Sequence, residues 1–310
     1  MTTTTKFCQT VGGLLTLLIA ANTCLAAEET ALAPVLGASD AAPLVLKLGV
    51  NDIYCTQTAC ECISEIATRS YDGVLAELAK NHGITLKLTY FMEVMDLDKA
   101  IQAKQFDGVI CKPWTALRFS KEAGPHFKRV ADILDPENSA TMTGLILVPA
   151  TSPIRTLAAL AGKRIAFGQP DSYEKYHAPL RLLASQGIRP GSGSYRSSCG
   201  ENLDLLMDGK VDGAVVSSYA LTASCAVDFA KPEDFRTVAK TGEMPLTSLL
   251  VDLNKVSPAA AMRLQRALLA VSGDKVPADL TGKGFVAPVS WQPAKAGAEI
   301  TPKAPQPDNP

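Results

Sequence analysis

The residues of this chain that are best suited to chemistry are cysteines, and four of its eight cysteines lie between residues 55 and 111. Cys55, Cys60 and Cys62 lie within one short stretch, and Cys111 ends an apolar stretch further along. Three thiolates on one loop would suit a soft metal such as Cu(I) or Zn(II). Their spacing matches no recognised metal or haem-attachment motif, however, and in an oxidising compartment an even number of cysteines favours disulfides. We therefore expect these four residues to form disulfides, and we predict no metal site and no cofactor.

Two more cysteines, Cys199 and Cys225, lie in the second half of the chain and are our first choice for a disulfide. Each is predicted near the carboxyl end of a strand in the same part of the fold. The six cysteines from Cys55 onward allow many connectivities, so the pairing of the other four stays open.

The start of the chain has the features of a secretory signal peptide. Lys6 supplies a positive charge, residues 11–21 form an apolar run rich in leucine, and small residues allow cleavage near Ala26 or Ala27. The apolar run is short for a transmembrane helix. Cys24 raises the alternative of a lipoprotein, but the two residues before it are not the small apolar pair that such processing prefers. We therefore expect an exported protein of the periplasm.

The rest of the chain alternates between predicted strands and helices, which is typical of an α/β fold with mostly parallel sheets. Its 310 residues, 47% of them hydrophobic and 20% charged, are enough for two lobes. The formal net charge of -1 does not indicate a nucleic-acid partner. We predict strands at residues 44–50, 85–91, 106–111, 127–134, 142–148, 163–167, around 195, 211–216, 235–238 and 246–252, and helices at 63–82, 97–104, 113–122 and 258–271.

One stretch, residues 160–177, carries the pattern of a ligand-binding joint. Gly162 ends a helix, residues 163–167 form a short buried strand, and Asp171 or Ser172 caps the helix that follows. A strand that leads into a helix N-terminus through a small loop leaves backbone N–H groups free to bind a polar or anionic ligand. Taken alone, this pattern fits an ordinary strand–helix joint of an α/β domain equally well.

Residues 160–167 (LAGKRIAF), with Asp171 and Ser172 at the next helix start, resemble the periplasmic solute-binding proteins of ABC importers, in particular their phosphonate- and phosphate-binding (PhnD-like) branch. Residues 105–110 (QFDGVI) and 209–214 (GKVDGA) add to this resemblance, which extends over residues 44–272. It implies a two-lobed, type II periplasmic-binding-protein-like fold, with two parallel-rich sheets flanked by helices and a ligand cleft between the lobes. It also implies a membrane ABC permease as the partner.

The chain departs from this family directly after Ser172. The phosphonate binders typically continue with small hydroxyl residues and glycine, whereas Tyr173, Glu174 and Lys175 follow here. A carboxylate beside an anion pocket is unfavourable, so this position bears on the choice of ligand.

An internal similarity supports two lobes. Residues 107–114 and 212–219 both start with Asp-Gly and continue with an apolar strand, a polar edge and an aromatic residue at the same offset. Two copies suggest two lobes that present equivalent walls to one cleft, although any buried strand before a helix has a similar pattern. We predict a signal peptide (1–27), a disordered spacer (28–43), a first lobe (44–138, completed by 239–292), a second lobe (139–238) and a disordered Pro-rich tail (293–310).

The candidate site follows from this fold, because ligands bind at the carboxyl ends of strands. Tyr173 and His177 share a helix face and could form a hard-metal site with Asp52, but an ordinary half-buried helix face is the expectation. The chain has no motif of a hydrolase, nucleotide-binding loop or zinc protease, so we predict no enzyme. We expect the ligand to be bound by Asp52, Tyr54, Lys112, Trp114, Thr115, Asp171, Ser172, Tyr173, Tyr176, His177, Ser217 and Tyr219.

We therefore interpret the chain as an exported, monomeric solute-binding protein that closes on its ligand by hinge motion. The expected ligand is small and polar or anionic, such as a phosphonate- or phosphate-like oxyanion, and is taken up by an ABC-type transporter. The alternative is a periplasmic metal-binding, metal-carrier or redox protein on the same fold, which would use Cys55, Cys60, Cys62 and Cys111.

Overall fold

The computed structural model describes residues 42–52, 71–121, 126–135, 138–196, 198–222, 230–271 and 284–291. The predicted signal peptide and Pro-rich tail lie outside these ranges, as does the predicted spacer apart from its last two residues. Tyr54, Cys55, Cys60, Cys62 and Cys225 lie outside them too. Within the described ranges, no helix combines the length and the apolar character that a membrane crossing requires.

The first of two large sheets has six strands, taken from both ends of the described chain. Each strand agrees with a predicted one to within a few residues, except for residues 284–286, for which we predict no strand. In spatial order the strands are β13 (Gly284–Val286), β4 (Phe127–Leu134), β12 (Ser248–Asp252), β3 (Gly108–Cys111), β1 (Leu44–Asn51) and β2 (Ile84–Tyr90).

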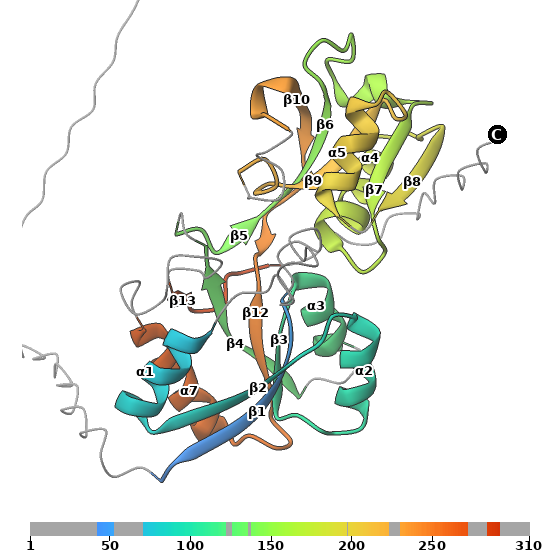
Figure 1. The fold of residues 1–310 in the computed structure, drawn as a ribbon. Helices are drawn as coiled ribbons and strands as arrows, with labels where there is room; N and C mark the ends of the chain where they lie inside the picture. Colours follow the sequence, from blue (N-terminus) through green and yellow to red (C-terminus); the bar gives the residue numbers. More distant parts are fainter. Residues whose placement is uncertain are drawn as a thin grey trace, which may run out of the picture. The chain divides into compact units, whose positions relative to one another are not determined.

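Helices cover both faces of this first sheet, because neighbouring residues of its central strands point to opposite sides. Ile110 and Leu249 face α1 (Asp72–His82) and α7 (Pro258–Ala270), which pack side by side (Figure 1). Val109 and Leu250 face α2 (Val94–Gln102) and α3 (Pro113–Lys121) instead. Both faces are buried, which explains why these strands are continuous apolar runs.

The ends of α1 and α7 follow from local sequence. Gly83 ends α1 with a φ of 60°, a left-handed conformation that favours glycine. The Ser257 side chain caps α7 by accepting a hydrogen bond from the Ala260 backbone N–H, and Pro258 occupies the first turn, as predicted.

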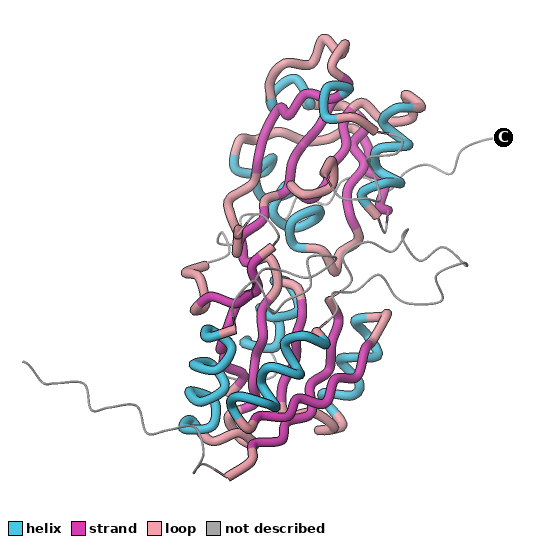
Figure 2. Tube along the Cα trace, turned by 60° about the vertical axis from the view of Figure 1, so that its left-hand side comes forward, coloured by secondary structure: helices cyan, strands magenta, loops and turns pink. Residues whose placement is uncertain are grey.

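The second large sheet has five strands and comes from one stretch in the middle of the chain. Leu145 and Leu147 pack with α5 (Cys199–Met207), while Ile146 and Val148 pack on the other face with α4 (Ala178–Ser185) and the 3₁₀ turn η2 (Leu157–Leu160). In Figure 2, helices flank the strands of each sheet. The spatial order is β10 (Phe235–Lys240), β6 (Gly144–Pro149), β9 (Gly213–Ser217), β7 (Arg164–Gly168) and β8 (Ser192–Arg196).

The chain passes between the two sheets twice, and the two crossings pair with each other. β5 (Thr141–Met142) leads from β4 to β6, and β11 (Met244–Pro245) leads from β10 to β12. The two short strands form a separate antiparallel ladder. The predicted crossing strand 142–148 is therefore divided, and Gly144 starts its second part.

Both large sheets are mixed rather than mostly parallel. In the first, β1 runs parallel to β2 and β3, whereas β12 runs antiparallel to β3 and β4. In the second, β7 runs parallel to β8 and β9, whereas β6 runs antiparallel to β9 and β10. The crossings cause this, because a strand that returns through them enters its sheet from the opposite end.

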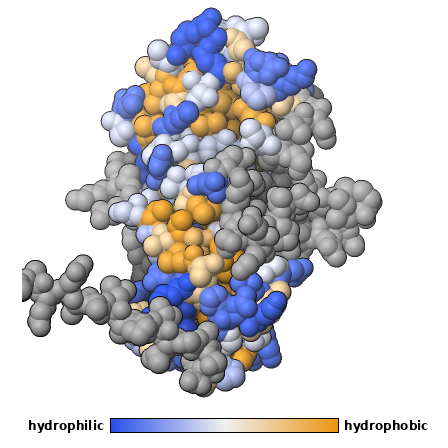
Figure 3. Space-filling model, turned by 90° about the vertical axis from the view of Figure 1, so that its left-hand side faces the viewer, coloured by the Kyte–Doolittle hydropathy of each residue, from blue (hydrophilic) through white to orange (hydrophobic). Residues whose placement is uncertain are grey.

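The described surface mixes polar and apolar side chains. On the face drawn in Figure 3, apolar side chains gather in two areas, and polar side chains lie around each of them.

Candidate functional site

The predicted site residues of the first sheet lie at the carboxyl ends of two neighbouring parallel strands. Asp52 directly follows β1, and Lys112, Trp114 and Thr115 follow β3, at the start of α3. The side chains of Asp52 and Thr115 are buried, and those of Lys112 and Trp114 are half-buried. Tyr54 lies outside the described residues.

The predicted residues of the second sheet occupy the equivalent edge. Asp171 to His177 follow β7, and Ser217 and Tyr219 end and follow β9, the parallel neighbour of β7. Asp171 is exposed, whereas Tyr173 and Ser217 are buried. Tyr176 is directed into the second sheet's core, where its ring lies 5.6 Å from that of Tyr195.

Aromatic side chains bring the two groups into contact. The ring of Trp114, from α3, stacks on His177 with a centroid distance of 3.9 Å and lies 5.9 Å from Tyr173. Tyr219 packs in the same cluster, which is completed by residues of the crossings such as Met142 and Met244. We call Trp114, Tyr173, His177 and Tyr219 the aromatic cluster. It joins side chains that follow strands of both sheets.

A fifth aromatic residue, Trp291, contacts this cluster and was not predicted as a site residue. Its ring and that of Tyr173 form a T-shaped contact, with an interplanar angle of 89° and a centroid distance of 5.2 Å. Arg181 also contacts Tyr173: its guanidinium lies 5.5 Å from the ring centroid and donates a 3.0 Å hydrogen bond to the phenol oxygen. No local pattern distinguishes Trp291, because it follows a short last strand and precedes the Pro-rich end of the chain.

Ser172 caps the helix after β7, as one of two predicted alternatives. Its hydroxyl accepts a hydrogen bond from the Lys175 backbone N–H at 3.3 Å. The first turn of the helix, η3 (Tyr173–His177), is a π-helix, and α4 continues from it. The wider turn carries the Lys175 side chain back over Gly168, where an added Cβ would lie 2.4 Å from the Lys175 Cβ. Only glycine fits at that position of β7.

Glu174, the carboxylate that the sequence puts beside the predicted anion pocket, was not among the predicted ligand-binding residues. It is only 1% exposed, and the Ser217 hydroxyl donates a 3.0 Å hydrogen bond to its Oε1. Burial opposes ionisation of this carboxyl, but Lys175 and Lys112 outweigh burial and lower its pKa. Glu174 is therefore a buried carboxylate, and it engages the Ser217 hydroxyl that we expected to face the ligand.

Further titratable groups surround Glu174. Burial lowers the pKa of Lys175, but Cys199 and the Glu174 carboxylate offset burial, so the net direction is upward and the ammonium form is favoured. Burial, with the Glu174 charge, raises the pKa of Tyr219, which keeps its phenol neutral. The site thus holds a charged Glu174–Lys175 pair beside the aromatic cluster.

Asp52 has a structural environment rather than that of a metal ligand. Tyr71 and Thr247 donate hydrogen bonds of 2.6 and 2.8 Å to its two oxygens, which ties β1 to the start of α1 and to the segment before β12. In the described part of the chain, no group of three His, Cys, Asp or Glu side chains is placed to hold a metal ion. His177 uses its ring instead to stack on Trp114 and to hydrogen-bond the Pro170 carbonyl at 2.7 Å.

No disulfide is shown for the two described cysteines, and the other four predicted partners lie outside the described residues. Cys111 and Cys199 are free and buried. Cys199 packs in the core under α5, where its sulfur accepts a hydrogen bond from the Ser217 N–H at 3.4 Å and lies 3.7 Å from the Ser217 hydroxyl. Cys111 lies in the core between the first sheet and α2 and α3, and burial raises its pKa. Each thiol faces a packed core rather than another cysteine among the described residues.

Comparison with known proteins gives one family. The sequence profile described as "ABC transporter, phosphonate, periplasmic substrate-binding protein" matches residues 64–290, which is more than half of the chain. No curated protein sequence matches the chain.

Solved structures with the same fold agree with this match, although their sequences are distant. PhnD1 from Prochlorococcus marinus, in complex with methylphosphonate, has a TM-score of 0.58 and 14% identity over 79% of this chain and 93% of its own. A binding protein component of a phosphonate ABC transporter from Pseudomonas aeruginosa has a TM-score of 0.57 and 16% identity over 79% and 82%. XAC2383 from Xanthomonas citri, bound to ATP, has a TM-score of 0.60 and 18% identity over 79% and 91%.

Proposed function

Because the chain belongs to the family of periplasmic substrate-binding proteins of phosphonate ABC transporters, which are binding proteins and not enzymes, we propose that it captures a small polar or anionic ligand and delivers it to a membrane ABC permease. A phosphonate-like or related oxyanion is the first ligand class to test. The single observation that carries this proposal is the stack of Trp114 on His177, which brings the carboxyl edges of the two sheets together.

The proposed lobes follow the sheets. The first consists of residues 44–138 with 239–292, and the second of residues 139–238, although β10 continues to Lys240 in the second sheet. The paired crossings β5 and β11 are suited to act as the hinge, because they are the short connection between two separately packed cores. The aromatic cluster would then form the walls that meet around the ligand.

The charged side chains of the candidate site bear on where it can attract an oxyanion. Lys112 and Lys175 both lie close enough to Glu174 to lower its pKa. Two positive charges therefore surround this one negative charge. The hydroxyls of Ser172 and Ser217 are already engaged within the chain. We therefore propose that Lys112, with the N–H groups at the start of α3, supplies the main attraction for an anion.

Tryptophan fluorescence during titration with methylphosphonate, with calorimetry in parallel, tests the proposal. Trp114 and Trp291 are the two tryptophans of the chain, and closure should change the emission of Trp114. We expect Trp114→Phe to reduce the signal, and Lys112→Met to weaken binding at least tenfold. Ser172→Ala removes a helix cap worth about 1 kcal/mol, so its thermal stability must be measured separately.

The outcome separates the ligand class from the binding function. Binding of sulfonates or carboxylates without methylphosphonate would change the ligand class only. If no small oxyanion binds, and calorimetry and fluorescence both stay flat, the proposed function is wrong.

The proposal also includes export to the periplasm and a monomeric state. The family is periplasmic, and the features of residues 1–27 support cleavage near Ala26 or Ala27. N-terminal sequencing of protein from the periplasm should begin at Ala27 or Glu28, whereas an intact Met1 or a lipid on Cys24 would contradict the cleavage site.

A further inference from the structure

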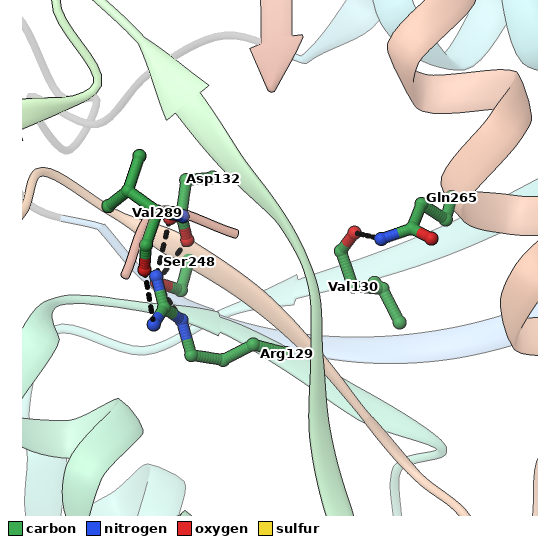
Figure 4. Close-up of polar contacts among 6 residues, drawn as sticks. All are labelled: Arg129, Val130, Asp132, Ser248, Gln265 and Val289. Carbon is green, nitrogen blue, oxygen red and sulfur yellow. Dashed lines mark hydrogen bonds and ion pairs between the residues drawn. The ribbon is translucent and has the colours of Figure 1, made fainter. Parts of the chain in front are cut away.

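The backbone after the last strand is held by a buried polar group, shown in Figure 4. Asp132, on β4, has no exposed side-chain surface and accepts a 2.7 Å hydrogen bond from the Val289 N–H. Arg129 donates to the Val289 carbonyl at 3.3 Å and forms an ion pair with Asp132. Ser248, on β12, donates a 2.7 Å hydrogen bond to Asp132 and accepts a 3.2 Å one from Arg129. Both backbone groups of Val289 are therefore fixed to the first sheet.

This arrangement determines where Trp291 lies, because only one residue separates it from Val289. β13 pairs with β4, so the segment starts within the first sheet. Two residues after Val289, the Trp291 ring lies against Tyr173, which belongs to the helix that follows β7 of the second sheet. A polar group in the first sheet thus positions an aromatic ring against a side chain of the second.

Tyr173 receives aromatic contacts from two directions. Trp114 stacks with it at an interplanar angle of 28°, and Trp291 meets it at 89°. The same hydrophobic cluster includes Tyr219 and the crossing residues Met142 and Met244. A ligand that reaches Tyr173 would therefore meet Trp291 as well as the two walls that the sequence predicts.

We propose that Trp291 is a further wall of the ligand site and that Arg129, Asp132 and Ser248 are the positioning residues that hold it there. The ligand role rests on the proposed function, whereas the positioning role does not. A ring delivered from the first sheet against Tyr173 would restrict the size of the organic group that an oxyanion ligand carries. Net stability does not explain the buried ion pair, because such pairs add little over apolar residues of the same volume.

Fluorescence of a single tryptophan tests the positioning role without a ligand. Trp114→Phe leaves Trp291 as the sole tryptophan of the chain. In this background, Arg129→Met and Ser248→Ala should raise the acrylamide quenching constant of Trp291 at least twofold and shift its emission to longer wavelength. Tyr173→Leu should act in the same direction, because it removes the ring that Trp291 contacts.

Gln265→Met is the matched control, because Gln265 donates a 2.6 Å hydrogen bond to the Val130 carbonyl on the same strand β4 (Figure 4). It ties α7 to β4 but does not bond to Val289. We expect it to change thermal stability without changing the quenching of Trp291. Quenching that stays the same in Arg129→Met and Ser248→Ala, or rises equally in Gln265→Met, would overturn the positioning role.

Calorimetry in the otherwise unchanged chain tests the ligand role, with methylphosphonate and the bulkier phenylphosphonate as probes. Trp291→Ala should weaken methylphosphonate binding several-fold and should improve phenylphosphonate binding relative to it. Equal affinities in the parent and in Trp291→Ala would show that Trp291 is not a wall. If the parent binds neither phosphonate, the ligand role stated here is wrong, and the quenching experiment still decides the positioning role.

Discussion

Replacing Glu174 by glutamine should reveal how much the buried carboxylate contributes to stability. Removing the Glu174 charge would leave the nearby Lys175 and Lys112 charges less compensated, and for a buried ion pair the loss of one partner costs about 3–5 kcal/mol. Glutamine retains an oxygen that can accept the Ser217 hydrogen bond, which limits the loss. We therefore expect Glu174→Gln to lower the free energy of unfolding by roughly 2–3 kcal/mol at neutral pH.

The pH dependence of this difference gives a second, independent measurement. The pKa of Glu174 is lower in the folded state than its ordinary value. Its carboxylate therefore contributes stability above the unfolded pKa of about 4.3, and the contribution is lost as the pH falls through the folded pKa. The free energies of unfolding of the parent and of Glu174→Gln should converge in acid.

Urea unfolding followed by circular dichroism, at a series of pH values from neutral to acidic, measures both effects. Glu243→Gln is the control, because Glu243 is exposed and this substitution makes the same chemical change at the surface. It should alter the free energy of unfolding by less than about 0.5 kcal/mol. A Glu174→Gln variant as stable as the parent at neutral pH, or a difference that stays constant into acid, would refute the reasoning.

Two further predictions concern packing in the second sheet and the thiols. An added Cβ at Gly144 would lie 2.0 Å from the Glu174 carbonyl oxygen, so Gly144→Ala should destabilise the protein by about 1–3 kcal/mol. Gly242→Ala, where nothing lies within 4 Å of the added Cβ, should leave the melting temperature nearly unchanged. Equal melting temperatures of Gly144→Ala and Gly242→Ala would contradict the close packing at Gly144. Cys111 and Cys199 should resist alkylation in the native protein and react after unfolding without reductant, as peptide mapping would show; a need for reductant would mean that they are bridged.

The fold could be predicted from the sequence because its strands and helices carry strong local signals. The apolar run of β4 and the capped, amphipathic α7 are placed to within one residue. Strand direction could not be predicted in the same way. Whether β12 enters beside β3 in parallel or antiparallel orientation depends on the crossings, which leave no periodic pattern in the sequence.

The position of a candidate site residue could be predicted only where the end of a strand places its side chain. Trp114 and Tyr173 follow strands at positions that topology alone brings to the same edge. The burial of Glu174 and the contact of Trp291 with the cluster could not be predicted, for different reasons. The π-helical turn that buries Glu174 has no recognised sequence signal, and Trp291 reaches the cluster through tertiary contacts of Val289 with residues far away in the sequence.

The order in which strands join the two sheets also constrains the order in which the sheets can fold as the chain becomes available from its N-terminus. All five strands of the second sheet come from residues 144–240, so this sheet can assemble as soon as that stretch is available. The first sheet cannot, because β12 is the central neighbour of both β3 and β4 and arrives later. Until then β3 and β4 have open edges, which are prone to unwanted pairing. A chain of this design can therefore have a folded middle portion while the early strands of its first sheet still have open edges.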